Sequence, residues 1–242
     1  RRRRRNRRLL TPPAAPHVSV VQVEVVRVFT DPDGNFGNPL GIVDGRHVAE
    51  ADRQRVAAAL GYSETVYIDD AATGTLRIYS ATGEMSFAGH PTVGAAAYLH
   101  THGHPVDTLH VPAGPIPVTR SGDLYAVRAD ATWGSRWDWH HLDSPEAVLA
   151  ADRTSYDAGH TFLWSWQDEP AGIIRARAFA PAMNVVEDEA TGSAVTQLTA
   201  QLTRDLLVVQ GAGSHLHTTW HPPTHATVGG RVVPAESRTL TI

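Results

Sequence analysis

The sequence contains no cysteine, and all 21 of its basic residues are arginine. Without cysteine the chain has no disulfide and no catalytic thiol, and its redox compartment is not encoded. The absence of lysine excludes a Schiff-base lysine and the lysine of a phosphate-binding P-loop. No apolar run approaches the roughly 18 residues that a membrane span needs, so we expect no membrane partner.

The composition indicates a soluble globular protein, because 42% of its 242 residues are hydrophobic and 19% are charged. This length accommodates one large domain or two small ones. No apolar segment follows the basic start of the chain, so it is not a secretory signal, and we expect a cytoplasmic protein.

Seven of the first eight residues are arginine, and a Pro- and Ala-rich stretch follows. This pattern is typical of an arm that binds nucleic acid or a membrane surface, of a disordered leader (1–17), or of a misassigned start. Without these seven residues, 14 arginines face 25 acidic residues, a net charge of −11. Such an acidic body argues against nucleic acid as a partner.

One stretch organises the second half of the chain, residues 179–194, which read F-A-P-A-M-N-V-V-E-D-E-A-T-G-S-A. It predicts a strand, an acidic loop and a helix over 194–202, with Ser193 as the N-cap and Gly192 letting the backbone approach a ligand. The free N–H groups of a helix start favour a bound anion, which Asp188 can reach from the loop. An ordinary capped helix is the alternative.

A second stretch of the same design covers residues 77–99, R-I-Y-S-A-T-G-E-M-S-F-A-G-H-P-T-V-G-A-A-A-Y-L. It predicts a strand, a loop and a helix over 91–102, with Pro91 at the first helical position and Gly103 ending the helix. Two such units, one in each half, indicate a pseudo-duplicated protein whose two helix starts face one ligand.

The remaining elements follow from β-branched runs, apolar spacing and turn residues. A helix is predicted over 49–60, ending at Gly61. The Pro-rich segment 112–117 is the predicted boundary between an N-terminal lobe (18–112) and a C-terminal lobe (113–242). Strands are predicted at 18–30, 40–43, 66–69, 108–111, 116–120, 124–129, 161–166, 175–179, 205–209, 215–220 and 231–233.

Four ordered segments carry a resemblance to a known family: Phe36–Pro39 (FGNP), Ser63–Tyr67 (SETVY), Phe87–Thr92 (FAGHPT) and Glu187–Ala194 (EDEATGSA). Together they resemble the signature blocks of the PhzF family, isomerases of the phenazine-biosynthesis type. The match spans roughly residues 20 to 205. The resemblance implies the α/β (α+β) fold of diaminopimelate epimerase, with two pseudo-symmetric lobes, each a mixed sheet wrapped around a central helix, and an active-site cleft between them.

The resemblance also implies roles for individual residues. Glu64 would be the general acid/base, although most glutamates beside a strand entry are simply solvated. His90 and Asp188 would hold or polarise the substrate, with helix capping as the alternative for His90. The expected substrate-binding residues are Asn38, Gly89, Gly192, Ser193 and, by a looser correspondence, His160.

The absence of thiols limits the mechanism. Cysteine-dependent epimerases of this fold place two thiols on either side of the substrate carbon, but the matching positions here are Ala88 and Thr191, so two-thiol racemisation is excluded. One carboxyl that removes and returns a proton remains possible. Burial in an apolar cleft would raise its pKa towards the working pH, and Glu64 is the candidate. Backbone N–H groups at both helix starts would stabilise the developing charge.

Two segments are ambiguous. The aromatic stretch 133–141 is interpreted as core packing or an interface, with a substrate wall as the alternative. His215, His217, His221 and His225 suggest a metal, but an H-x-H pattern on a strand does not by itself define a site, and we expect none.

We therefore expect a cofactor-free isomerase that moves a proton, and with it a double bond, in a small carboxylated metabolite such as trans-2,3-dihydro-3-hydroxyanthranilate. The resemblance further implies a homodimer. The alternatives are an epimerase or lyase of the same fold, a non-catalytic small-molecule binding protein and, more remotely, a nucleic-acid-binding module.

Overall fold

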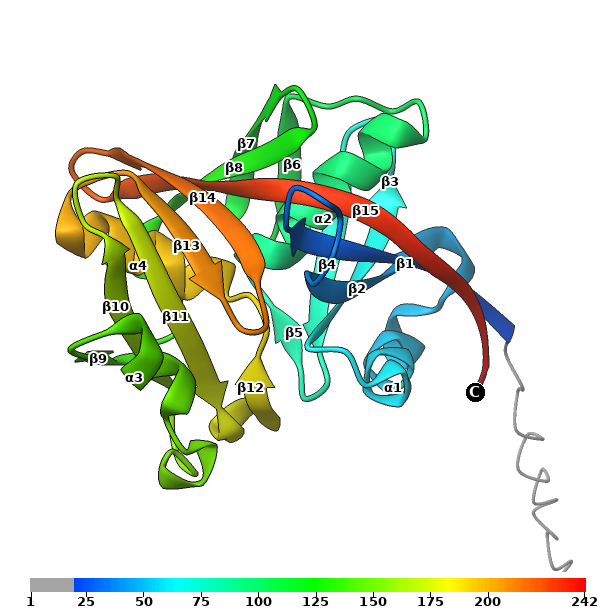
Figure 1. The fold of residues 1–242 in the computed structure, drawn as a ribbon. Coiled ribbons are helices and arrows are strands. Elements are labelled where there is room, and N and C mark those ends of the chain that lie inside the picture. Colours follow the sequence, from blue (N-terminus) through cyan, green and yellow to red (C-terminus); the bar gives the residue numbers. More distant parts are fainter. Residues whose placement is uncertain (1–19) are drawn as a thin grey trace, which may run out of the picture.

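A computed structural model describes residues 20–242, so the predicted leader 1–17 lies outside the described residues. A mixed sheet of fifteen strands curls around two central helices, α2 (Gly89–Thr101) and α4 (Gly192–Leu202), which lie in different halves of the molecule (Figure 1). No helix in the described part is long and apolar enough to span a bilayer.

In the first half, strands close into a ring around α2, because β1 pairs with both β2 and β15. Ten of the thirteen residues of α2 are buried, and its Gly and Ala side chains allow the strands to approach closely. The ring consists of β1 (Val20–Thr30), β2 (Asn38–Asp44), β3 (Glu64–Asp70), β4 (Thr75–Ser80), β6 (Thr108–Val111), β7 (Gly114–Ser121), β8 (Leu124–Asp130) and β15 (His225–Thr241).

In the second half, the sheet continues from β15 and covers α4, which packs on β14 and β15. The 17-residue strand β15 therefore belongs to both halves, as its long path in Figure 1 makes visible. The other strands are, in order from β15, β14 (Ser214–His221), β13 (Leu206–Gln210), β11 (Ile173–Ala180), β10 (Thr161–Asp168) and β9 (Asp138–His141).

Two helices cover the outside of the sheet. The helix α1 (Glu50–Leu60) packs Val56 and Leu60 against β1 and β3, and α3 (Pro145–Ala150) packs Val148 against β10 and β11. Short elements complete the chain: β5 (Glu84–Met85), β12 (Val185–Asp188) and the 3₁₀ turns η1 (Gly45–His47), η2 (Ala131–Trp133), η3 (Arg153–Ser155) and η4 (Pro181–Met183).

The predicted helices and strands form, with shifted ends. Both central helices begin two residues before the predicted start, so Pro91 is the third helical residue and Thr191, not Ser193, is the N-cap. The first four N–H groups of a helix have no partner within it, which is why a proline is tolerated there. The strand predicted at 231–233 is in fact β15, which is much longer because it pairs with β14 and β8 and then with β1.

The segment predicted as a lobe boundary, 112–117, lies in the turn and second strand of the β6–β7 hairpin. The ring around α2 continues beyond it to Asp130, because β7 and β8 are needed to close the ring onto β15. The division into lobes at residue 112 stays a prediction.

Substituting Gly94 with alanine should destabilise the ring around α2. A Cβ there would lie 2.4 Å from Leu40 Cδ2 and 2.8 Å from Val28 Cγ2, so these fully buried side chains of β2 and β1 would have to shift. We expect the free energy of unfolding in urea to fall by about 1–3 kcal/mol. Gly83→Ala, where no atom lies within 4 Å of the added Cβ, is the control and should change little.

Candidate active site

A cavity of about 230 Å³ lies where the N-termini of α2 and α4 meet. The N-cap residues of both helices, Ala88 and Thr191, are part of its wall. Its other polar lining comes from two carboxyls and several hydroxyls: Glu64, Asp188, Ser63, Ser86, Ser135 and Ser193. Its other apolar lining combines three aromatic side chains with aliphatic ones and methionines: Phe87, Trp133, Trp137, Ala180, Val185, Met85 and Met183.

Two glycines bring the helix starts together. A Cβ on Gly89 would lie 3.1 Å from Gly192 Cα, and a Cβ on Gly192 would lie 2.9 Å from the backbone nitrogen of His90. Any side chain at either position would push the helices apart. Because the two N-termini adjoin one cavity, their dipoles and first N–H groups together favour a negatively charged group.

Glu64 and His90 form a buried pair beside the cavity. Glu64 is the first residue of β3, and its Oε2 lies 2.9 Å from Nδ1 of His90 on α2. The side chain of Glu64 is 12% exposed and that of His90 is 4% exposed. Since an ionised carboxylate only accepts hydrogen bonds, Nδ1 of His90 carries the proton between them.

Asp188, the last residue of β12, is the second carboxyl of the cavity, and protein donors occupy both of its oxygens. Asn38 Nδ2 donates to Oδ1 over 2.7 Å, and Thr191 Oγ1 donates to Oδ2 over 2.7 Å. Asn38 comes from β2, so this contact links the two halves of the molecule.

The two carboxyls have pKa values that move in opposite directions. Burial raises the pKa of Glu64, but the hydrogen bond and charge of His90 outweigh burial and leave that pKa below its ordinary value. Burial and the nearby charge of Glu64 raise the pKa of Asp188 to about 6, despite its hydrogen bonds from Thr191 and Asn38. The expectation that burial would raise the pKa of Glu64 is therefore wrong, because of His90.

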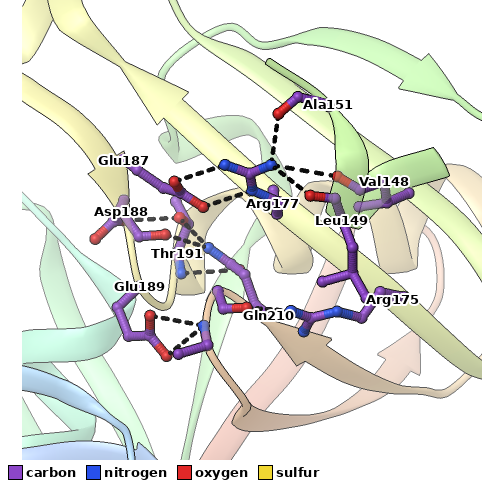
Figure 2. A network of polar contacts seen from close by, with 12 residues as sticks. Val148, Leu149, Ala151, Arg175, Arg177, Glu187, Asp188, Glu189, Thr191 and Gln210 are labelled. Carbon is purple, nitrogen blue, oxygen red and sulfur yellow. Dashed lines mark hydrogen bonds and ion pairs between the residues drawn. The ribbon is translucent and has the colours of Figure 1, made fainter. Parts of the chain in front are cut away.

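The loop that carries Asp188 is held by its acidic neighbours (Figure 2). Glu187 forms a two-pronged ion pair with Arg177, at 2.7 and 2.8 Å, and Arg177 also donates to carbonyls at the end of α3. Glu189 turns the other way and accepts from the backbone N–H of Ala212 and from the hydroxyl of Ser214. Of three consecutive acidic residues, only Asp188 lines the cavity.

The aromatic stretch that the sequence left ambiguous forms part of the cavity wall through Trp133 and Trp137. Trp133 packs edge-on against Phe87, with ring centroids 5.5 Å apart, and Gln197 of α4 donates to the carbonyl of Ser135. Gly134 lets this segment lie directly on α4, because a Cβ there would lie 3.2 Å from Cβ of Ser193.

Comparison with known proteins agrees with this geometry. The sequence model of the PhzC-PhzF family, described as phenazine biosynthesis-like protein, matches residues 26–132. The trans-2,3-dihydro-3-hydroxyanthranilate isomerase of Pseudomonas fluorescens is 28% identical over 209 residues, which cover 69% of this chain and 75% of the relative. The crystal structure of a PhzF-family phenazine biosynthesis protein from Enterococcus faecalis superposes with a TM-score of 0.74 at 18% identity, covering 92% of this chain and 100% of that one.

The resemblance of the chain to the PhzF family is thus confirmed. A hydroxyproline epimerase from Agrobacterium vitis shares the fold at 10% identity, with a TM-score of 0.63 over 92% of this chain and 93% of that one. The predicted fold class, with its resemblance to diaminopimelate epimerase, is thus confirmed. Its relatives identify this chain as an enzyme of the isomerase and epimerase class of this fold.

The structure brings most of the predicted site residues together. Glu64, Asp188 and Ser193 line the cavity, while His90 contacts Glu64 from behind, and Asn38 contacts Asp188. Gly89 and Gly192 form the contact between the helix starts. His160 is not part of the wall; its ring lies against Trp137, with centroids 5.4 Å apart. The catalytic and binding roles of these residues stay predictions.

Sequence reasoning did not assign a role to Thr191 or Gln210, which contact Asp188 through hydrogen bonds. Thr191 stands inside a signature block, so its position was a usable signal. Gln210 lies 19 residues further along, and no local pattern marks it. Within residues 20–242, no three His, Asp or Glu side chains are grouped as metal ligands.

The stability of the protein should report the pKa of Asp188. Its carboxyl has a pKa of about 6 when folded against an ordinary value of 3.8, so the folded state holds the proton more tightly. Asp188 therefore costs stability as the pH rises from about 4 to 6, by about 3 kcal/mol in total. Asp188→Asn removes this cost. As the pH rises over that range, the free energy of unfolding in urea should therefore increase for the variant relative to the parent protein.

Asp107→Asn, which replaces an exposed aspartate, is the matched control for the loss of one carboxyl. A difference between Asp188→Asn and the parent protein that stays constant over this pH range would contradict the raised pKa.

Proposed function

We propose that this chain is a cofactor-independent isomerase that moves a proton between two carbon atoms of a small carboxylated metabolite. The observation that carries the proposal is a pair of buried carboxyls, Glu64 and Asp188, on one small cavity at the start of two helices. Groups whose surroundings push their pKa values apart are suited to act as base and acid in the same reaction.

Glu64 acts as the base in this proposal. Its pKa lies below the ordinary value, so the carboxylate is ionised at neutral pH and accepts a proton from a substrate carbon. The same carboxyl then returns the proton to a different carbon, which shifts the double bond. His90 holds the carboxylate by its Nδ1–H and orients it.

Asp188 acts as the acid. With a pKa of about 6, a fraction of this carboxyl remains protonated near neutral pH and donates a hydrogen bond to the oxygen on which charge develops. The first N–H groups of α2 and α4 and the hydroxyl of Ser193 bind the substrate carboxylate. Such preorganised donors stabilise the developing charge more than they stabilise the ground state.

The substrate class follows from the relatives and the size of the cavity. The Pseudomonas relative is named for trans-2,3-dihydro-3-hydroxyanthranilate, a small carboxylated ring. A cavity of about 230 Å³ lined by Phe87, Trp133 and Trp137 suits a molecule of that size and flatness. A homodimer and a cytoplasmic location remain parts of the proposal.

Epimerisation at a single carbon is the second candidate. It is favoured by the presence of two carboxyls, because one can remove the proton from one face while the other delivers a proton to the opposite face. The structure of the product separates the two candidate reactions. The isomerase moves the double bond, whereas the epimerase inverts the configuration of one carbon.

Proton exchange is the decisive measurement. The protein is incubated in D₂O with hydroxy-amino and unsaturated carboxylic acids, beginning with 2,3-dihydro-3-hydroxyanthranilate, and NMR follows deuterium entering carbon positions. We expect Glu64→Gln to slow exchange by about 10²-fold or more, because the amide cannot accept the proton. Glu50→Gln, on the exposed first turn of α1, is the matched control and should exchange normally.

Undiminished exchange in Glu64→Gln would overturn the assignment of the base. If compounds of the panel bind but none of them takes up deuterium, a non-catalytic binding protein is favoured.

A further inference from the structure

A chain of hydrogen bonds that begins outside the cavity ends on Asp188. Gln210, the last residue of β13, is fully buried and has no part in the reaction proposed above. Its amide contacts Thr191 and the backbone of Asp188, as the dashed lines in Figure 2 show. A buried side-chain amide with three hydrogen bonds to one loop is well suited to control the geometry of that loop.

The orientation of the Gln210 amide is determined by backbone groups. Its Oε1 accepts from the backbone N–H of Thr191 over 3.1 Å, and its Nε2 donates to the backbone carbonyl of Asp188 over 2.9 Å. Since an N–H only donates and a carbonyl only accepts, the flipped amide would lose both hydrogen bonds.

This orientation also determines the direction of the Thr191 hydroxyl. Nε2 of Gln210 donates to Thr191 Oγ1 over 2.8 Å, so the hydroxyl oxygen accepts there. Accepting there uses one of the two lone pairs of this oxygen. Oδ2 of Asp188, 2.7 Å away, accepts the single hydroxyl proton, so Thr191 donates to Asp188.

The other oxygen of Asp188 faces a donor of equally determined direction. Asn38 Nδ2 donates to the backbone carbonyl of Ala190 over 3.1 Å and to Oδ1 of Asp188 over 2.7 Å. Each carboxyl oxygen thus uses one lone pair for a protein donor. An acidic proton on Asp188 has to occupy one of the remaining lone pairs.

We propose that Gln210 is a positioning residue, which acts through Thr191 to make the Asp188 carboxyl present its acidic proton to the cavity. The proposal rests on the function proposed above, in which Asp188 is the acid. The charged groups that face Asp188 from other elements are Glu64 on β3 and His90 on α2. Its neighbours Glu187 and Glu189 are engaged with Arg177 and with Ala212 and Ser214.

The test is a titration that needs no substrate. Protein with ¹³C-labelled aspartate is titrated by NMR, and the carboxyl signal of Asp188 is assigned with Asp188→Asn. We expect Thr191→Val to raise the pKa of Asp188 by about one unit, because the ionised form loses a hydrogen-bond donor. Thr191→Ser keeps the hydroxyl and should restore the parent value.

Thr199→Val is the matched control. Thr199 lies on α4, the helix that Thr191 precedes, is also buried, and loses a 2.6 Å hydrogen bond to Thr218 when its hydroxyl is removed. This variant should lose stability without moving the titration of Asp188. If the effect of Thr191→Val came from a general loosening of α4, the pKa of Asp188 would shift in the same way in Thr191→Val and in Thr199→Val.

Gln210→Glu tests whether Gln210 determines the direction of the hydrogen bond from Thr191 to Asp188. The new carboxylate still accepts from the N–H of Thr191, but it also accepts the Thr191 hydroxyl proton and withdraws it from Asp188. Its negative charge adds to the resulting rise in the pKa of Asp188. The pKa of Asp188 should rise by at least as much as in Thr191→Val. An unchanged pKa of Asp188 in both Thr191→Val and Gln210→Glu would overturn the proposal.

The same variants separate this inference from the proposed function. If the titration moves as expected but the parent protein exchanges no substrate proton, Gln210 and Thr191 control Asp188, and the isomerase assignment fails. If exchange depends on Glu64 but the titration does not move, the isomerase assignment holds, and the role of Gln210 fails.

Discussion

The contact between Gly89 and Gly192 is the constraint on which the site depends. It lets the starts of α2 and α4 touch, although the two helices lie within different halves of the sheet. With a Cβ at either position, the helices would separate, and the two sets of free N–H groups would no longer face one cavity. The cavity is therefore a consequence of close backbone packing.

The electrostatics of the site follow from what surrounds each carboxyl. Glu64 faces the imidazole of His90, whereas Asp188 faces the negative charge of Glu64 and neutral donors. Two carboxyls of similar intrinsic acidity thereby acquire different protonation states at one pH. The acidic neighbours of Asp188 contribute by anchoring the loop to Arg177 and Ser214 and not by adding their charges to the cavity.

Much of the fold was predictable from local patterns. The β-branched runs, the Ala-rich helices and Gly61 at the end of α1 each act over a few residues, and the structure has elements at these positions. The start of α4 was misjudged by two residues because Ser193 resembles a capping residue, yet Thr191 precedes the helix and its hydroxyl bonds to Asp188. The length of β15 was missed because its partners, β1 and β8, lie far away in sequence.

By itself, the sequence determined which chemistries are open to this protein. With neither cysteine nor lysine, thiol and Schiff-base catalysis are excluded, and four short blocks carry the resemblance to the PhzF family and contain the carboxyl candidates. Only the tertiary structure decided which carboxyl has a lowered pKa and which has a raised one, because the causes are burial and the neighbours His90 and Glu64, which folding brings in from distant parts of the chain. The pKa of a buried group depends on the distances to such neighbours, and folding alone sets those distances.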